Sequence, residues 1–133
     1  MPVIKIDKAA LQAGMPIEPN WYKATVKSIE HKPSNAGDSI NYITVLEIND
    51  GPMSGRQPKP KYFNSKGMGY MTDFVEAAVG EKINRDEDLN IDTDDLVSKN
   101  LWIKVENTTF EGRIQNEVQN YASIGTDPNA LPF

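Results

Sequence analysis

The sequence contains no cysteine, and its only histidine is His31. Disulfides and thiolate zinc sites are therefore excluded, and His31 has no cysteine with which to form a catalytic dyad. His31 stands between Glu30 and Lys32 at the end of a predicted strand, so we expect it to be exposed. No segment approaches the roughly 18 apolar residues of a membrane span, and the first residues lack the apolar run of a signal peptide. These absences favour a cytoplasmic protein with no membrane partner.

Sequence motifs of catalysis are also missing. The phosphate-loop pattern G-x-x-x-x-G-K-[ST] does not occur. An acidic stretch spaces Asp88, Asn90 and Asp92 like the first ligands of an EF-hand loop, but Thr93 replaces the required glycine and Lys99 the bidentate glutamate. We interpret this stretch as a solvated acidic loop. The sequence thus predicts a binding protein that is not an enzyme, with no metal and no other cofactor.

Charge is distributed unevenly along the chain. The net charge of −5 is unfavourable for a nucleic-acid binder, because phosphate contacts require lysine and arginine. Residues 19–70, however, hold seven basic and four acidic side chains. Residues 71–100 hold three basic and nine acidic side chains. The first half is therefore mildly basic, at +3, and could face a polyanion.

The periodicity of apolar residues predicts five strands and one helix. Apolar and polar residues alternate over residues 21–29 and 100–106, and residues 40–48 and 110–121 complete the set of clear strands. Residues 56–64 contain Pro58 and Pro60, which cannot donate ladder hydrogen bonds, so this strand is placed at an edge and pairs through residues 61–63. Residues 69–79 follow a helical period that ends at Gly80, and a shorter helix is expected between residues 92 and 99.

Three strands, a helix and two strands form the arrangement of the OB-fold. The predicted fold is mainly β: a five-stranded OB-like barrel with one helix between strands 3 and 4 and a flexible C-terminal tail. Its length suits one domain. We assign residues 1–18 to an N-terminal arm, residues 19–124 to the domain and residues 125–133 to the tail.

Aromatic and basic residues share the predicted strands. Flat rings that stack on bases, interspersed with cations for phosphates, are what single-strand binding requires. The candidate nucleic-acid-binding residues are Lys23, Lys27, Tyr42, Lys59, Lys61, Tyr62, Trp102, Lys104, Phe110 and Arg113. The alternative is that aromatic residues simply fill the barrel, which applies to Tyr22, Tyr42, Phe63, Phe74 and Tyr121. Trp102 either caps one barrel end or is offered to a ligand.

A family resemblance rests on diffuse positions rather than on one motif. The succession of WYKATV, a polar loop, INYITVLEI ending in DG, an amphipathic helix ending in VG, LWIKVE and G-R-x-x-N-x-V resembles phage-type single-stranded DNA-binding proteins with an OB-fold, over residues 19–124. At the C-terminus, Leu131, Pro132 and Phe133 are similar to the Pro-Phe tip by which such proteins recruit replication and repair proteins. Only Asp127 represents the acidic cluster that usually precedes this tip.

The sequence predicts one function and leaves one alternative open. The first is sequence-tolerant binding of single-stranded DNA in replication, recombination or repair, by a phage-encoded protein in the host cytoplasm. Its expected partners are single-stranded DNA, replication or recombination proteins bound through the tail, and a second copy in a homo-oligomer. The alternative is a protein–protein adaptor or assembly component on a small β-barrel, which the net negative charge would favour.

Overall fold

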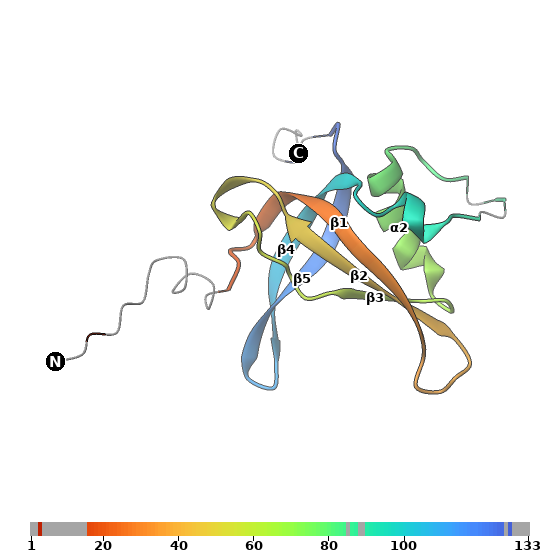
Figure 1. Ribbon diagram of the computed structural model, residues 1–133, viewed down its shortest axis with the longest axis horizontal. Coiled ribbons are helices and arrows are strands. Elements are labelled where there is room, and N and C mark those ends of the chain that lie inside the picture. The colour runs from red at the N-terminus through yellow and green to blue at the C-terminus, as the bar shows by residue number, and fades with distance from the viewer. Residues whose placement is uncertain (1–2, 4–15, 85, 88–89, 127, 129–133) are drawn as a thin grey trace.

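The computed structural model describes residues 3, 16–84, 86–87, 90–126 and 128. Its main element is one antiparallel sheet of five strands, in the order β3-β2-β1-β4-β5 (Figure 1). The strands are β1 (Asn20–Pro33), β2 (Ile40–Ile48), β3 (Lys61–Asn64), β4 (Asn100–Phe110) and β5 (Arg113–Ser123). The mainly β class with five strands and one helix is therefore confirmed.

Helix α2 (Met68–Val79) follows β3 in the chain and precedes β4. It begins one residue before the predicted start, and it ends at Gly80, whose left-handed φ of 85° suits glycine. Its apolar stripe includes Met71, Phe74 and Val75, which are buried against the sheet. The expected second helix is only a short 3₁₀ turn, η2 (Thr93–Asp95), and a similar turn, η1 (Gly51–Met53), follows β2. No helix within the described residues is long and apolar enough to cross a membrane.

The hydrogen bonds form an open sheet, with β3 and β5 at its two ends. The two ends approach each other at Lys59, whose backbone N–H donates to the carbonyl of Asn116 over 2.8 Å. Lys59 stands between Pro58 and Pro60, which have no N–H to donate. A continuous ladder therefore cannot extend through residues 58–60, directly before β3. Within the described residues no β3–β5 ladder closes the sheet, so the predicted barrel is open at this point.

Both long hairpins exceed their predicted lengths. The first strand was expected to end at residue 29 and continues to Pro33, while the fourth was expected to end at residue 106 and continues to Phe110. Cross-strand pairing to β2 and β5 sustains both extensions. The hairpin of β1 and β2 and the hairpin of β4 and β5 project toward the same side of the molecule, on either side of β3 (Figure 1).

The core also takes in a residue that was assigned to the N-terminal arm. Ile17 is only 1% exposed and joins the buried cluster of the sheet and α2. Asn116 on β5 holds it in place: its side-chain Oδ1 accepts from the Ile17 N–H over 2.8 Å, and its Nδ2 donates to the Ile17 carbonyl over 2.9 Å. The folded unit therefore begins before residue 19.

Candidate nucleic-acid interface

The hairpin of β4 and β5, one of the two that flank β3, has a well-defined turn. In the hairpin of β4 and β5, Glu111 and Gly112 form the connection with φ values of 51° and 77°. Positive φ at both central residues is typical of a type I′ turn, whose twist matches that of the flanking strands. The turn therefore continues the twist of the two strands out to the tip, so Arg113 lies directly after a well-formed turn.

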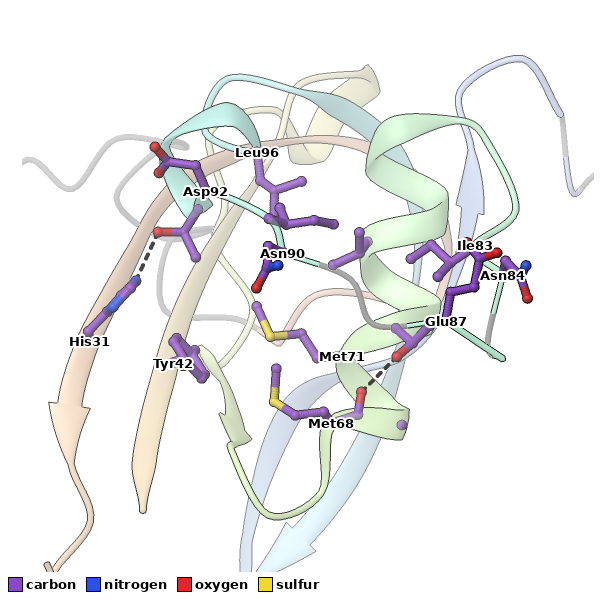
Figure 2. Close-up of a pocket in the computed structure, with 15 residues that line it drawn as sticks. His31, Tyr42, Met68, Met71, Ile83, Asn84, Glu87, Asn90, Asp92 and Leu96 are labelled. Carbon is purple, nitrogen blue, oxygen red and sulfur yellow. Dashed lines mark hydrogen bonds between the residues drawn. The ribbon is translucent and has the colours of Figure 1, made fainter. Parts of the chain in front are cut away.

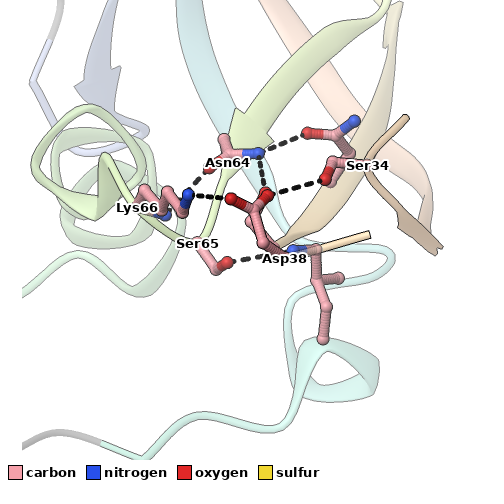
Figure 3. A network of polar contacts seen from close by, with 8 residues as sticks. Ser34, Asp38, Asn64, Ser65 and Lys66 are labelled. Atoms are coloured by element: carbon pink, nitrogen blue, oxygen red, sulfur yellow. Dashed lines mark hydrogen bonds and ion pairs between the residues drawn. The ribbon is translucent and has the colours of Figure 1, made fainter. Parts of the chain in front are cut away.

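Polar contacts fasten the loop between β1 and β2 to the end of β3 (Figure 3). Lys66 forms an ion pair with Asp38, and this contact is the main reason why the pKa of Asp38 lies below its usual value. Asn64 Nδ2 donates to Ser39 Oγ over 3.0 Å and to Asn41 Oδ1 over 2.8 Å. The loop of the first hairpin is thus held against the end of β3, just before α2 begins.

Four predicted site residues lie on β3, on the segment that leads into it and at the start of β5, and we call Lys59, Lys61, Tyr62 and Arg113 the hairpin-flanked patch. Tyr62 lies on β3 opposite Ile43 and is 60% exposed. Lys59 Nζ reaches Gln115 Oε1 over 3.2 Å, and Arg113 is two residues from Gln115 on β5, a rise of about 7 Å along the strand. The segment leading into β3 is therefore brought close to the second hairpin.

The cations of this patch differ in how they are paired. Lys59 lies 3.7 Å from Glu117, which is an exposed ion pair of small energetic worth. Lys61 and Arg113 form no ion pair with any residue that the structure describes. Two side chains of the patch are therefore available to an anion, and a third can exchange partners.

A second group of predicted residues lies on β1 and β4, and we call Lys23, Lys27, Trp102 and Lys104 the Trp102 cluster. Lys23 is the cross-strand partner of Trp102, and its Nζ lies 5.4 Å from the centroid of the indole ring. The other two lysines face carboxylates, Lys27 with Glu47 and Lys104 with Glu106, each at 3.4 Å. These pairs leave the cluster little free positive charge.

Trp102 itself is covered. Only 7% of the residue is exposed, and its indole Nε1 has no hydrogen-bond partner among the described atoms. Of the two roles left open by the sequence, the structure favours the buried one, because a base cannot stack on a ring that solvent does not reach. Cross-strand neighbours on β1 and β5, at Lys23 and Ala122, account for its position inside the sheet.

Tyr42 does not join either group. It lies on the inner face of β2, where it packs against the core, and its ring meets His31 edge-on at a centroid distance of 4.8 Å. The structure thus places Tyr42 with the interior aromatic residues, which is the alternative that the sequence left open for it. His31 is exposed as expected, although its Nε2 lies 2.8 Å from Thr93 Oγ1.

The aromatic residues of the interior pack against one another in the core. Phe63 and Phe74 are buried and stacked with ring centroids 5.5 Å apart, and Tyr121 lies 5.6 Å from Phe74. Burial raises the pKa of Tyr121 well above its ordinary value, and Asp73 adds to the shift. The predicted site residues Leu131, Pro132 and Phe133 lie outside the described residues, as does the side chain of Phe110.

Sequence reasoning missed the residues that hold these surfaces in shape. Asn116 joins three segments, since it bonds to Ile17, to the backbone of Lys59 and, over 2.6 Å, to Asn107 Oδ1. Lys66 and Asp38 were likewise passed over. A single sequence offers no signal for such contacts, because the partners lie up to 99 residues apart.

Comparison with known proteins does not assign the chain to a family. No protein-family model matches the sequence, and no significant match to it is found among curated proteins. The function must therefore be argued from the geometry described above.

Proposed function

We propose that the protein binds single-stranded DNA across the hairpin-flanked patch. In this proposal a base stacks on Tyr62, and phosphates are bound by Lys59, Lys61 and Arg113. The observation that carries it is an exposed aromatic ring on β3 between two projecting hairpins, with Lys61 next to it in the sequence and Arg113 at the start of β5. Aromatic platforms of this kind bind bases without regard to sequence, while cations follow the backbone.

The place of the patch in the fold supports the same function. OB-folds bind oligonucleotides on the face of strands 2 and 3, between the loop that joins strands 1 and 2 and the loop that joins strands 4 and 5. We infer that the open sheet acts as an OB-like barrel, with Lys59 bridging the gap between β3 and β5. The resemblance to phage-type single-strand binders agrees with this assignment and adds the proposed role in replication, recombination or repair.

The Trp102 cluster has a secondary part in this proposal. Lys23, Lys27 and Lys104 lie on the outer side of β1 and β4, where they can contact phosphates of a longer strand. Lys27 and Lys104 would first exchange their carboxylate partners. Exposed ion pairs contribute little stability, so this exchange costs little. The predicted affinity therefore rests mainly on Tyr62 and the unpaired cations.

Fluorescence anisotropy with a labelled oligo-dT tests the proposal. We expect the wild type to bind oligo-dT more tightly than a duplex of equal length, because duplex bases are not free to stack. The Tyr62→Ala variant should lose about 1–3 kcal/mol of binding free energy. Tyr70→Ala is the matched control, since Tyr70 is 80% exposed on α2, outside the patch.

Two results would overturn the proposal. One is the absence of oligo-dT binding at low salt, which would favour the adaptor function. The other is an equal loss in the Tyr62 and Tyr70 variants, which would show that binding does not use the patch. Circular dichroism of each variant confirms that the comparison is made between folded proteins.

A further inference from the structure

A second surface lies between α2 and the segment that precedes β4. It is a half-open groove of about 770 Å³, within the size range of binding clefts. One wall is helix α2, another is formed by described residues between α2 and β4, among them Ile83, Ile91 and Leu96, and the third is formed by His31 and Tyr42 at the ends of β1 and β2 (Figure 2). The hydrogen bond between His31 and Thr93 joins two of these walls.

The floor and sides of the groove are apolar and adaptable. Met71 and Leu96 are buried at its base, while Met68 is 40% exposed at its edge. Figure 2 shows both thioethers between α2 and Tyr42. Methionine is unbranched and polarizable, and surfaces rich in it accept apolar side chains of varied shape. The groove therefore suits a flexible apolar group such as leucine.

The rim of the groove is acidic. Glu87 and Asp92 are its charged lining residues within the described chain, and Asp86, Asp94 and Asp95 are exposed nearby in the sequence. Residues 71–100, which contain most of the lining, carry nine acidic and three basic side chains. This field repels a polyanion and attracts a cation. The groove is thus opposite in charge character to the hairpin-flanked patch.

We infer that this groove is a docking site for a partner protein, which inserts an apolar side chain beside Met68 and Met71 and places lysine or arginine against Glu87 and Asp92. The occupant is a basic, amphipathic segment of a protein other than this one. Charge complementarity selects it over a nucleic acid, whose phosphates would meet the acidic rim. The inference does not depend on single-stranded DNA binding, because the two surfaces share no residue.

Methionine methyl groups give a direct test. The chain has five methionines, and Met53, on the 3₁₀ turn after β2, serves as an internal reference away from the groove. In a spectrum of protein labelled with ¹³C at the methionine methyls, a 12-residue amphipathic peptide of leucine and lysine should shift the signals of Met68 and Met71 and leave Met53 unchanged. Met68→Leu, Met71→Leu and Met53→Leu variants assign the three signals.

The charge requirement is tested with matched peptides and variants. A peptide with glutamate in place of each lysine should cause no shift. Removing one carboxylate, as in Glu87→Gln or Asp92→Asn, should weaken the lysine peptide by up to about fivefold. Asparagine can still cap η2 in place of Asp92, which accepts from the Asp94 N–H. Glu106→Gln, on β4, is the control and should bind as the wild type does.

Four results would overturn the inference. Equal shifts from the glutamate peptide would show that the acidic rim does not select a basic peptide. The absence of shifts with the lysine peptide at millimolar concentration would show that the groove does not bind it. Shifts of Met68 and Met71 with oligo-dT would make the groove part of the nucleic-acid surface. Shifts that depend on protein concentration alone would identify a second copy as the occupant.

Discussion

Tyr62 and Trp102 are both large aromatic residues on the outer side of the same sheet, yet one is 60% exposed and the other 7%. Tyr62 lies on β3, which is paired along one side only, whereas Trp102 lies on β4 between β1 and β5. Strand alternation decides which side of the sheet a residue faces. The neighbouring strands then decide whether it reaches solvent, and this is why one ring suits a ligand and the other stabilises the fold.

The largest expected effect comes from Trp102→Ala. Truncating a buried tryptophan costs about 3–5 kcal/mol of unfolding free energy, which urea denaturation measures. The fraction that remains folded should bind oligo-dT nearly as the wild type does. Unchanged stability together with a loss of affinity for oligo-dT would contradict this assignment. Trp102 would then be the ring that stacks on a base, and Tyr62 would not contribute to binding.

Asn116→Ala should loosen the side of the sheet that carries Tyr62. The variant loses the side-chain bonds to the backbone of Ile17 and to Asn107, and leaving such partners unsatisfied costs about 1–3 kcal/mol. Hydrogen exchange should accelerate at Ile17 and Lys59 while the amides around Trp102 remain protected. Gln119→Ala, an exposed change on the same strand, should alter neither quantity. Uniform acceleration would mean that the two regions unfold together.

A smaller effect is expected from the two unpaired cations of the hairpin-flanked patch. Each phosphate contact adds about 0.7 to the slope of log affinity against log salt on a single strand, so Lys61→Ala and Arg113→Ala should each flatten the slope by that amount. Lys82→Ala, an exposed change after α2, is the control. If Lys23→Ala flattened the slope more than either, the phosphates would follow the Trp102 cluster instead.

The smallest effect extends the comparison to a third ring, Tyr121, which packs against the core and whose hydroxyl has no hydrogen-bond partner among the described residues. Its pKa is raised by burial, so the unfolded state loses the phenolic proton first. The contribution to stability is complete below about pH 10 and is lost as pH rises toward the folded-state pKa. Melting temperatures at neutral pH and above pH 10 should therefore diverge less in Tyr121→Phe than in the wild type. Equal divergence would mean that another group controls alkaline unfolding.

Local pattern was enough to predict the strands and the helix, because alternation and helical period depend on residues close in sequence. The four residues that periodicity selected for the helix stripe, Met71, Phe74, Val75 and Ala78, are all buried. The backbone contact by which the segment before β3 approaches β5 was not predictable in this way. It depends on how Lys59, between two prolines, meets a carbonyl on a distant strand.

The candidate site was only partly accessible to the same reasoning. Lys59, Lys61, Tyr62 and Arg113 were selected as aromatic and basic residues on strands, and the structure brings Lys59 into contact with β5, the strand of Arg113. Tyr42 satisfied the same criterion but faces α2, since the sequence did not reveal that the helix covers that end of β2. Composition identifies candidates, and the packing of distant segments divides them into separate surfaces.

The hydrogen bonds between Ile17 and Asn116 have a consequence for the folding of the protein during its synthesis. The two residues are 99 positions apart, and β1 also depends on β4 for one of its two neighbouring strands. Contacts of such high sequence separation form late and slow folding. A nascent chain therefore leaves the ribosome with the edge of β1 open until almost the last strand has emerged. During that interval the unpaired edge of β1 is a site at which the chain can aggregate.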